Sequence, residues 1–168
     1  MLICSRYVGC LLVASFALAG CAGASSPGEG KPAASAEAQS PGAACLANAS
    51  RERAPKSEKD LPSLTLKQIL IHHAESKNAK EGVTRSREQA CLRAAEARDK
   101  VVAGADFDAA VAEYSDEAGA QSRAGMVGNV KREELVKPVA DAAFALEVNE
   151  MSDLVETPFG FHLLLRAP

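Results

Sequence analysis

The composition of this 168-residue chain changes abruptly near residue 62, and the change limits how much of the chain can fold. Between residues 22 and 60, Ala, Gly, Ser and Pro fill 25 of 39 positions, and Leu46 is the single large apolar side chain. Such a stretch buries too little apolar surface to offset the entropy lost on ordering. We therefore expect a flexible tether over residues 21–62 and one folded domain over residues 63–168.

The N-terminus has the pattern of an export signal. Arg6 is followed by an apolar run that ends at Gly20 and is too short to remain as a membrane-spanning helix. The run closes with Leu-Ala-Gly-Cys, which resembles the lipobox of bacterial lipoproteins, where cleavage before the Cys leaves its thiol diacylated. An ordinary signal peptide with a chance Cys is the alternative. On the lipobox interpretation, residues 1–20 are the signal peptide and Cys21 is the lipid anchor, because two acyl chains hold a protein stably on a membrane.

This interpretation also predicts where the protein is located. A lipid-anchored chain of this kind belongs to the bacterial cell envelope, and the absence of Asp after Cys21 favours the outer membrane, facing the periplasm. That compartment is oxidising, so Cys45 and Cys91 can form one disulfide. The alternative is that Cys91 stays a buried free thiol on an apolar helix face.

Charge and spacing exclude two classes of partner. The chain has 19 Lys and Arg against 22 Asp and Glu, so no basic field is available to hold a phosphate backbone, and no nucleic-acid partner is expected. No CxxC or HxxxH spacing occurs, so no metal site is expected.

Residues 63–168 carry the periodic patterns of an α+β domain. Alternation over residues 66–73 predicts a strand, and the Ser-Arg-Glu-Gln capping box at residues 86–89 begins a long helix. The expected elements, in chain order, are a strand over 66–73, a helix over 86–103, a second helix capped by Asp106, a short strand over 126–131, a third helix from Pro138 and a hairpin over 154–165. The order is β-α-α-β-α-β-β, with first and last strands in one sheet.

Polar residues interrupt two of the expected strands. Gln68 lies between Leu66 and Leu70 on one face, and His162 lies among apolar neighbours in the last strand. A polar group on a buried face needs a hydrogen-bond partner. The two side chains therefore either satisfy each other in the core or belong to a functional site.

Three segments carry a family resemblance: residues 68–71 (QILI), 106–116 (DFDAAVAEYSD) and 155–162 (VETPFGFH). In order and spacing, the chain from Leu66 to Pro168 resembles the parvulin-type (rotamase, PpiC-like) peptidyl-prolyl cis-trans isomerases. The resemblance implies a four-stranded antiparallel sheet wrapped by about four helices, with a proline pocket on one sheet face. Rotating an X–Pro bond breaks no covalent bond, so the activity requires no cofactor and no metal.

The resemblance also implies roles for individual residues. The catalytic set is Gln68, Glu117, Thr157 and His162, and the substrate-binding set is Val127, Leu135, Val139, Phe159, His72 and Lys77. Gln68 stands where the family has His, and Glu117 where it has Cys or Asp. Val139 replaces a pocket Phe and leaves less apolar wall. Structural alternatives exist: Val127, Leu135 and Val139 can be ordinary core residues, and Glu117 can be a solvated turn residue.

We expect a foldase that isomerises X–Pro bonds in exported or envelope polypeptides, its unfolded or proline-containing clients, while attached to the membrane through lipidated Cys21. The alternative is a non-catalytic, parvulin-like chaperone or peptide-binding module, which Gln68 and Val139 favour. Lys77 and His72 predict a preference for an acidic residue before Pro, although Lys77 also fits a solvated charged loop.

Overall fold

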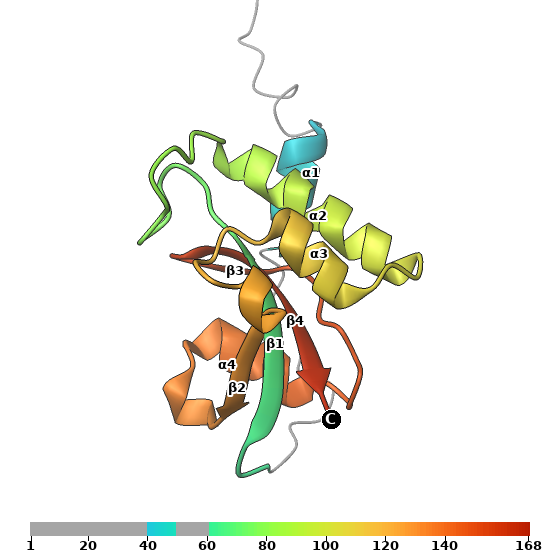
Figure 1. Cartoon of the computed structure of the whole chain (residues 1–168). Helices are drawn as coiled ribbons and strands as arrows, with labels where there is room; N and C mark the ends of the chain where they lie inside the picture. Colours follow the sequence, from blue (N-terminus) through green and yellow to red (C-terminus); the bar gives the residue numbers. More distant parts are fainter. Residues whose placement is uncertain (1–39, 50–60) are drawn as a thin grey trace, which may run out of the picture. The chain divides into compact units, whose positions relative to one another are not determined.

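The computed structural model describes residues 40–49 and 61–168 (Figure 1). The strands are β1 (Leu64–Ile71), β2 (Met126–Val130), β3 (Val155–Thr157) and β4 (Gly160–Ala167). The helices are α1 (Pro41–Ala49), α2 (Arg87–Val102), α3 (Phe107–Tyr114) and α4 (Lys137–Ala145), with short 3-10 helices η2 (Gln121–Arg123) and η3 (Arg132–Glu134). From β1 onward, the order of strands and α-helices is the predicted β-α-α-β-α-β-β, which confirms the α+β fold class.

The four strands form one antiparallel sheet in the order β2-β1-β4-β3. The central strand β1 pairs with β4 so that Gln68 lies opposite Leu164 and Leu70 lies opposite His162. On the other side of β4, Val155 of β3 is the partner of His162. This register places residues from three neighbouring strands on one face of the sheet, because side chains on paired positions point to the same side.

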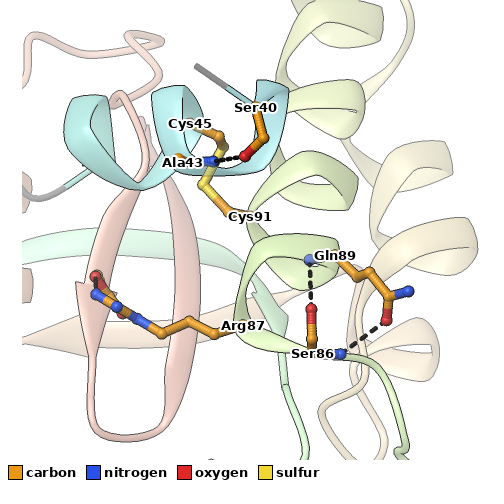
Figure 2. The surroundings of a disulfide bond; sticks show 8 residues. Ser40, Ala43, Cys45, Ser86, Arg87, Gln89 and Cys91 are labelled. Atoms are coloured by element: carbon orange, nitrogen blue, oxygen red, sulfur yellow. Dashed lines mark hydrogen bonds and ion pairs between the residues drawn. A yellow bond between two sulfur atoms is a disulfide. The ribbon is translucent and has the colours of Figure 1, made fainter. Parts of the chain in front are cut away.

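The helix ends follow the capping signals in the sequence. Ser86 accepts a hydrogen bond from the backbone N–H of Gln89 (3.2 Å), and the Gln89 side chain accepts one from the Ser86 N–H (2.8 Å), which completes the predicted capping box of α2 (Figure 2). Asp106 caps α3 by accepting from the N–H groups of Asp108 (2.9 Å) and Ala109 (3.0 Å).

Two apolar clusters form the core, one on each face of the sheet. The first packs α2 and α3 against Ile69, Ile71, Phe161 and Leu163. The second packs α4 against the opposite face of β1 and β4, including Leu164. Figure 1 shows the corresponding arrangement, with α2 and α3 on one side of the sheet and α4 on the other.

Helix α1 is the main departure from the sequence analysis, which expected a flexible tether throughout residues 21–62. For residues 41–49 this prediction is wrong: they form a helix that packs on α2, and Cys45 is bonded to Cys91 (Figure 2). The packing is close, since a Cβ on Gly42 would lie 2.6 Å from the Cβ of Glu88. Of the two alternatives left open for Cys91, the structure has the disulfide.

The remaining predictions for the N-terminal part, including the signal peptide at residues 1–20 and the lipid anchor at Cys21, lie outside the described residues. In the ranges that are described, no helix combines the length and apolar character needed to cross a membrane.

Candidate active site

Three neighbouring strands bring the central polar side chains together. Gln68 on β1, His162 on β4 and Thr157 on β3 occupy the α4 face of the sheet, toward the end where β3 and β4 form their hairpin. Gln68 and His162 are diagonal neighbours across the β1–β4 pair, close enough for long side chains to touch. The fourth predicted catalytic residue, Glu117, follows the C-terminus of α3. The structure therefore gathers all four residues of the predicted catalytic set.

These side chains form a continuous hydrogen-bonded chain. Thr157 Oγ1 lies 2.7 Å from His162 Nε2, and His162 Nδ1 lies 3.3 Å from Gln68 Oε1. Gln68 Nε2 then donates to Glu117 Oε2 at 3.0 Å. At the other end of the chain, the backbone N–H of Phe159 donates to Thr157 Oγ1 at 3.1 Å.

The Glu117 carboxylate sets the direction of the bonds to Gln68 and to His162 Nδ1. A carboxylate only accepts, so the Gln68 amide nitrogen faces Glu117 and its oxygen faces His162. His162 Nδ1 must then carry the proton, and in the neutral imidazole Nε2 accepts from the Thr157 hydroxyl, which also lies 3.5 Å from the carbonyl oxygen of Gly160.

The surroundings of His162 favour this neutral form. The residue is only 5% exposed. Burial, with a smaller contribution from nearby His72, lowers the pKa of His162 to about 4. At neutral pH the residue is therefore an uncharged hydrogen-bonding group.

The segment carrying Glu117 is docked onto the end of β1 by its neighbour Asp116. The Asp116 N–H donates to the carbonyl of Leu70 (2.8 Å), and its carboxylate accepts from the N–H of His72 (2.9 Å). Arg85 pairs with the same carboxylate and donates to the His72 carbonyl (3.1 Å). The sequence analysis assigned no role to Asp116 or Arg85, because their pairing depends on which loop meets the strand end.

The two residues expected to favour an acidic residue before Pro lie in different environments. His72 is 6% exposed, and its Nδ1 has no hydrogen-bond partner among the described residues. Burial lowers its pKa, so it is not a cation at neutral pH. Lys77 is exposed, and its backbone N–H donates to the carbonyl of Pro158 (2.8 Å). His72 and Lys77 therefore do not act as two cations, and the predicted preference for an acidic residue before Pro depends on Lys77 alone.

The expected substrate-binding residues also differ in exposure. Val127 on β2 is 39% exposed and Leu135 is partly buried, whereas Val139 on α4 is 4% exposed and belongs to the second core cluster. Phe159 lies half-buried in the β3–β4 turn. Val127, Leu135 and Phe159 are thus open to a ligand, and Val139 sits beneath the surface.

A shallow depression of about 360 Å³ adjoins this region. It is lined by Leu135, Ala140, Arg132, Lys137 and Asp141, and does not include the residues of the polar chain. The two basic residues both pair with Asp141. It is a surface feature next to η3 and α4, distinct from the Gln68–His162 centre.

The described residues hold no group of three or more His, Cys, Asp or Glu side chains suited to a metal ion. The chemistry available at the site is that of hydrogen-bond donors and acceptors in fixed directions beside apolar side chains.

Sequence comparison places the domain among known proteins. Residues 69–167 match the model of the rotamase family, described as the PPIC-type PPIase domain. The peptidyl-prolyl cis-trans isomerase pin1 of Schizosaccharomyces pombe is 32% identical over 116 residues, covering 67% of this chain and 66% of that protein. Foldase protein PrsA 4 of Bacillus cereus is 34% identical over 71 residues, covering 42% of this chain and 25% of the foldase. The chain thus spans only part of the length of these two curated relatives.

Solved structures agree on the fold. Peptidyl-prolyl isomerase ESS1 from Candida albicans superposes with a TM-score of 0.61 at 23% identity, covering 67% of this chain and 66% of the other. The structure of PrsA from Bacillus cereus gives a TM-score of 0.52 at 26% identity, covering 64% and 35%. The sheet order and these superpositions agree on the fold, and the family match over residues 69–167 shows that the chain belongs to the PPIC-type (parvulin) peptidyl-prolyl isomerase family.

Proposed function

We propose that the domain is a peptidyl-prolyl cis-trans isomerase that acts on X–Pro bonds of exported or envelope polypeptides. The observation that carries the proposal is the hydrogen-bonded chain from Thr157 through His162 and Gln68 to Glu117, on the sheet face shared with α4. Membership of the isomerase family supports the same activity.

Isomerisation of an X–Pro bond requires few reactive groups from the protein. The barrier to rotation about a peptide bond is about 18–20 kcal/mol and no covalent bond breaks. Twisting the amide removes its resonance and changes the hydrogen-bonding demand at the carbonyl and the nitrogen. A site whose donors and acceptors are already fixed, and partly shielded from water, stabilises that twisted state more than the planar one. We assign this role to Gln68, Glu117, Thr157 and His162.

The substrate side of the site is proposed from exposure and position. Val127, Leu135 and Phe159 contact the proline and its neighbours, and Val139 supports them from the core. His72 and Lys77 lie beside the residue that precedes Pro. Because His72 is buried with a lowered pKa, any preference for an acidic residue depends on the exposed Lys77.

The cellular setting of the activity is supported by the N-terminal sequence. The lipobox-like residues 18–21 favour a lipid anchor at Cys21, and one relative is named a foldase. We therefore propose that clients are unfolded, proline-containing polypeptides met at the outer membrane, on its periplasmic side.

The direct test is a protease-coupled isomerisation assay of the purified full chain on a panel of Glu-Pro, Ala-Pro and Lys-Pro peptides. We expect acceleration over the uncatalysed rate for all three, with Glu-Pro the fastest if Lys77 contacts the preceding residue. Binding of the peptides without acceleration would overturn the enzymatic proposal and support the peptide-binding alternative. Equal rates for all three peptides would remove the role of Lys77.

The variant His162→Ala tests the site, and His73→Ala is its matched control. Both residues are buried, but the His73 ring accepts from the N–H of Glu75 and lies outside the polar chain. We expect His162→Ala to lower both turnover and melting temperature, because Thr157 and Gln68 lose their shared partner. His73→Ala should leave turnover unchanged. Unchanged turnover in His162→Ala would remove this site from the mechanism.

A further inference from the structure

Arg123, the last residue of η2, makes contacts that reach from the Glu117 loop to β2. Its Nη2 lies 2.6 Å from Glu117 Oε1 as an ion pair. Its Nη1 donates to the carbonyl of Ala118 (3.0 Å), and its Nε donates to the carbonyl of Met126 (2.9 Å). One guanidinium thus joins the side chain of Glu117, the backbone after it and the first residue of β2.

Glu117 is held by different partners at its two oxygens. Oε1 faces Arg123, and Oε2 accepts the Gln68 amide nitrogen at 3.0 Å. Removing Arg123 frees one end of the carboxylate, which is already 27% exposed. The carboxylate can then rotate away from Gln68, and the main constraint on the direction of the Gln68 amide is lost.

The orientation of the Gln68 amide decides which ring nitrogen of His162 carries the proton. While Gln68 Oε1 faces the ring, Nδ1 carries the proton. A flipped amide presents its NH₂ group instead, so Nδ1 must accept and the proton moves to Nε2. The Thr157 hydroxyl, 2.7 Å from Nε2, must then accept from the ring instead, and the Gly160 carbonyl, 3.5 Å away, is the acceptor left for its proton.

We propose that Arg123 is a positioning residue for this site: by holding the Glu117 carboxylate against Gln68, it fixes the Nδ1–H tautomer of His162. The effect on turnover rests on the proposed isomerase function, whereas the effect on the tautomer does not.

The planar guanidinium is needed for this role. Its three nitrogens donate in three fixed directions, to a carboxylate and two carbonyls, whereas a Lys ammonium is a single point charge on a flexible stem. The Arg123 side chain is 38% exposed, and ion pairs this open to water contribute little to folding. Variants at this position should therefore fold, which keeps the test informative.

The test compares Arg123→Met and Arg123→Lys with Arg98→Met in the full chain. Arg98 is the matched control, because it pairs with Asp153 at similar exposure but outside the polar chain. The readouts are the tautomer of His162 from ¹⁵N NMR of the ring nitrogens, the melting temperature and peptide turnover.

We expect wild type and Arg98→Met to show one tautomer, Nδ1–H, and Arg123→Met to show a mixture with unchanged folding. Turnover in Arg123→Met should fall about tenfold, the effect of one lost hydrogen bond in the transition state. Arg123→Lys should recover part of the Nδ1–H population, because it keeps the charge that attracts Glu117 and loses the two carbonyl contacts.

A single Nδ1–H tautomer in Arg123→Met would overturn the proposal, and so would a fall in turnover without a change in tautomer. If the wild-type chain shows no isomerase activity, the proposed function fails, but the tautomer measurement still decides the role of Arg123.

Discussion

At the scale of single residues, the site depends on His162 being neutral and held from both sides. Its ring lies between Gln68 and Thr157, and its pKa is lowered to about 4 mainly by burial. The same burial that makes the ring a fixed hydrogen-bonding group makes its protonation costly.

This leads to a prediction for stability against pH. An unfolded His has a pKa near 6.5, so between pH 6.5 and about 4 the unfolded chain binds a proton that folded His162 does not. The free energy of unfolding is therefore highest above pH 6.5 and decreases as the pH falls toward 4. The decrease is on the order of 3 kcal/mol. Urea denaturation at pH 7 and pH 4.5 measures it.

The control for this prediction is His162→Gln, which keeps a polar side chain but does not titrate. Its stability should depend less on pH than that of the wild type. Some dependence should remain, because the pKa of His72 is also lowered. Identical pH dependence in the two proteins would show that His162 is not the residue responsible.

The sequence analysis reached Gln68 and His162 because polar residues on apolar strands are conspicuous in the printed sequence. Arg123 was missed, since nothing near it in the sequence marks it as different from other basic residues. Its significance comes from η2, which brings it within 2.6 Å of Glu117.

At the scale of elements, the close contact between β1 and the start of β2 depends on Gly125. Its φ is +69°, and a Cβ there would lie 2.6 Å from the Gln68 carbonyl oxygen and 2.7 Å from Val111 Cγ2. Gly125 also accepts from the Gln68 N–H (2.8 Å), so this contact fixes the strand position that carries Gln68.

We therefore expect Gly125→Ala to destabilise the fold by more than Gly82→Ala. Both positions have positive φ, at a cost of about 1–2 kcal/mol for a non-glycine residue, but nothing lies within 4 Å of a Cβ at Gly82. The clash at Gly125 should add about 1–3 kcal/mol. Thermal denaturation compares the stabilities of the two variants directly. Equal losses of stability would mean that β2 can shift to relieve the clash without destabilising the fold.

Helix α1 illustrates a second effect at this scale. It belongs to a stretch poor in apolar residues, yet Cys45, Leu46 and Ala49 pack against the first core cluster. The bond to Cys91 spans 46 residues of sequence. For a loop of this length, the entropy that the cross-link removes from the unfolded chain corresponds to about 4 kcal/mol.

Reduction of the disulfide, or the double variant Cys45→Ala and Cys91→Ala, should lower the melting temperature and leave turnover at 25 °C unchanged. The reason is that α1 packs on α2, whose core cluster covers the sheet face opposite the polar chain. Melting curves with and without reductant, paired with the peptide assay, test this. Loss of turnover in the folded, reduced protein would show coupling between α1 and the site.

At the scale of the whole molecule, the proposal joins an enzyme domain to a membrane anchor. If Cys21 carries the lipid, Cys21→Ser should move the protein from the membrane fraction to the soluble fraction, because the two acyl chains supply the attachment. Cys10→Ser is the matched control and should leave the distribution unchanged. Detergent phase partition measures both, and a Cys21→Ser protein that stays in the detergent phase would contradict the lipid anchor.

Local patterns in the chain were sufficient for the order of elements, the caps of α2 and α3, and the two polar strand positions, because alternation and capping act within a few residues. The partner of Cys45, the direction of the Gln68 amide and the pairing of Glu117 with Arg123 depended on folding. Each joins residues from different elements, and only the packing of those elements brings the atoms within bonding distance.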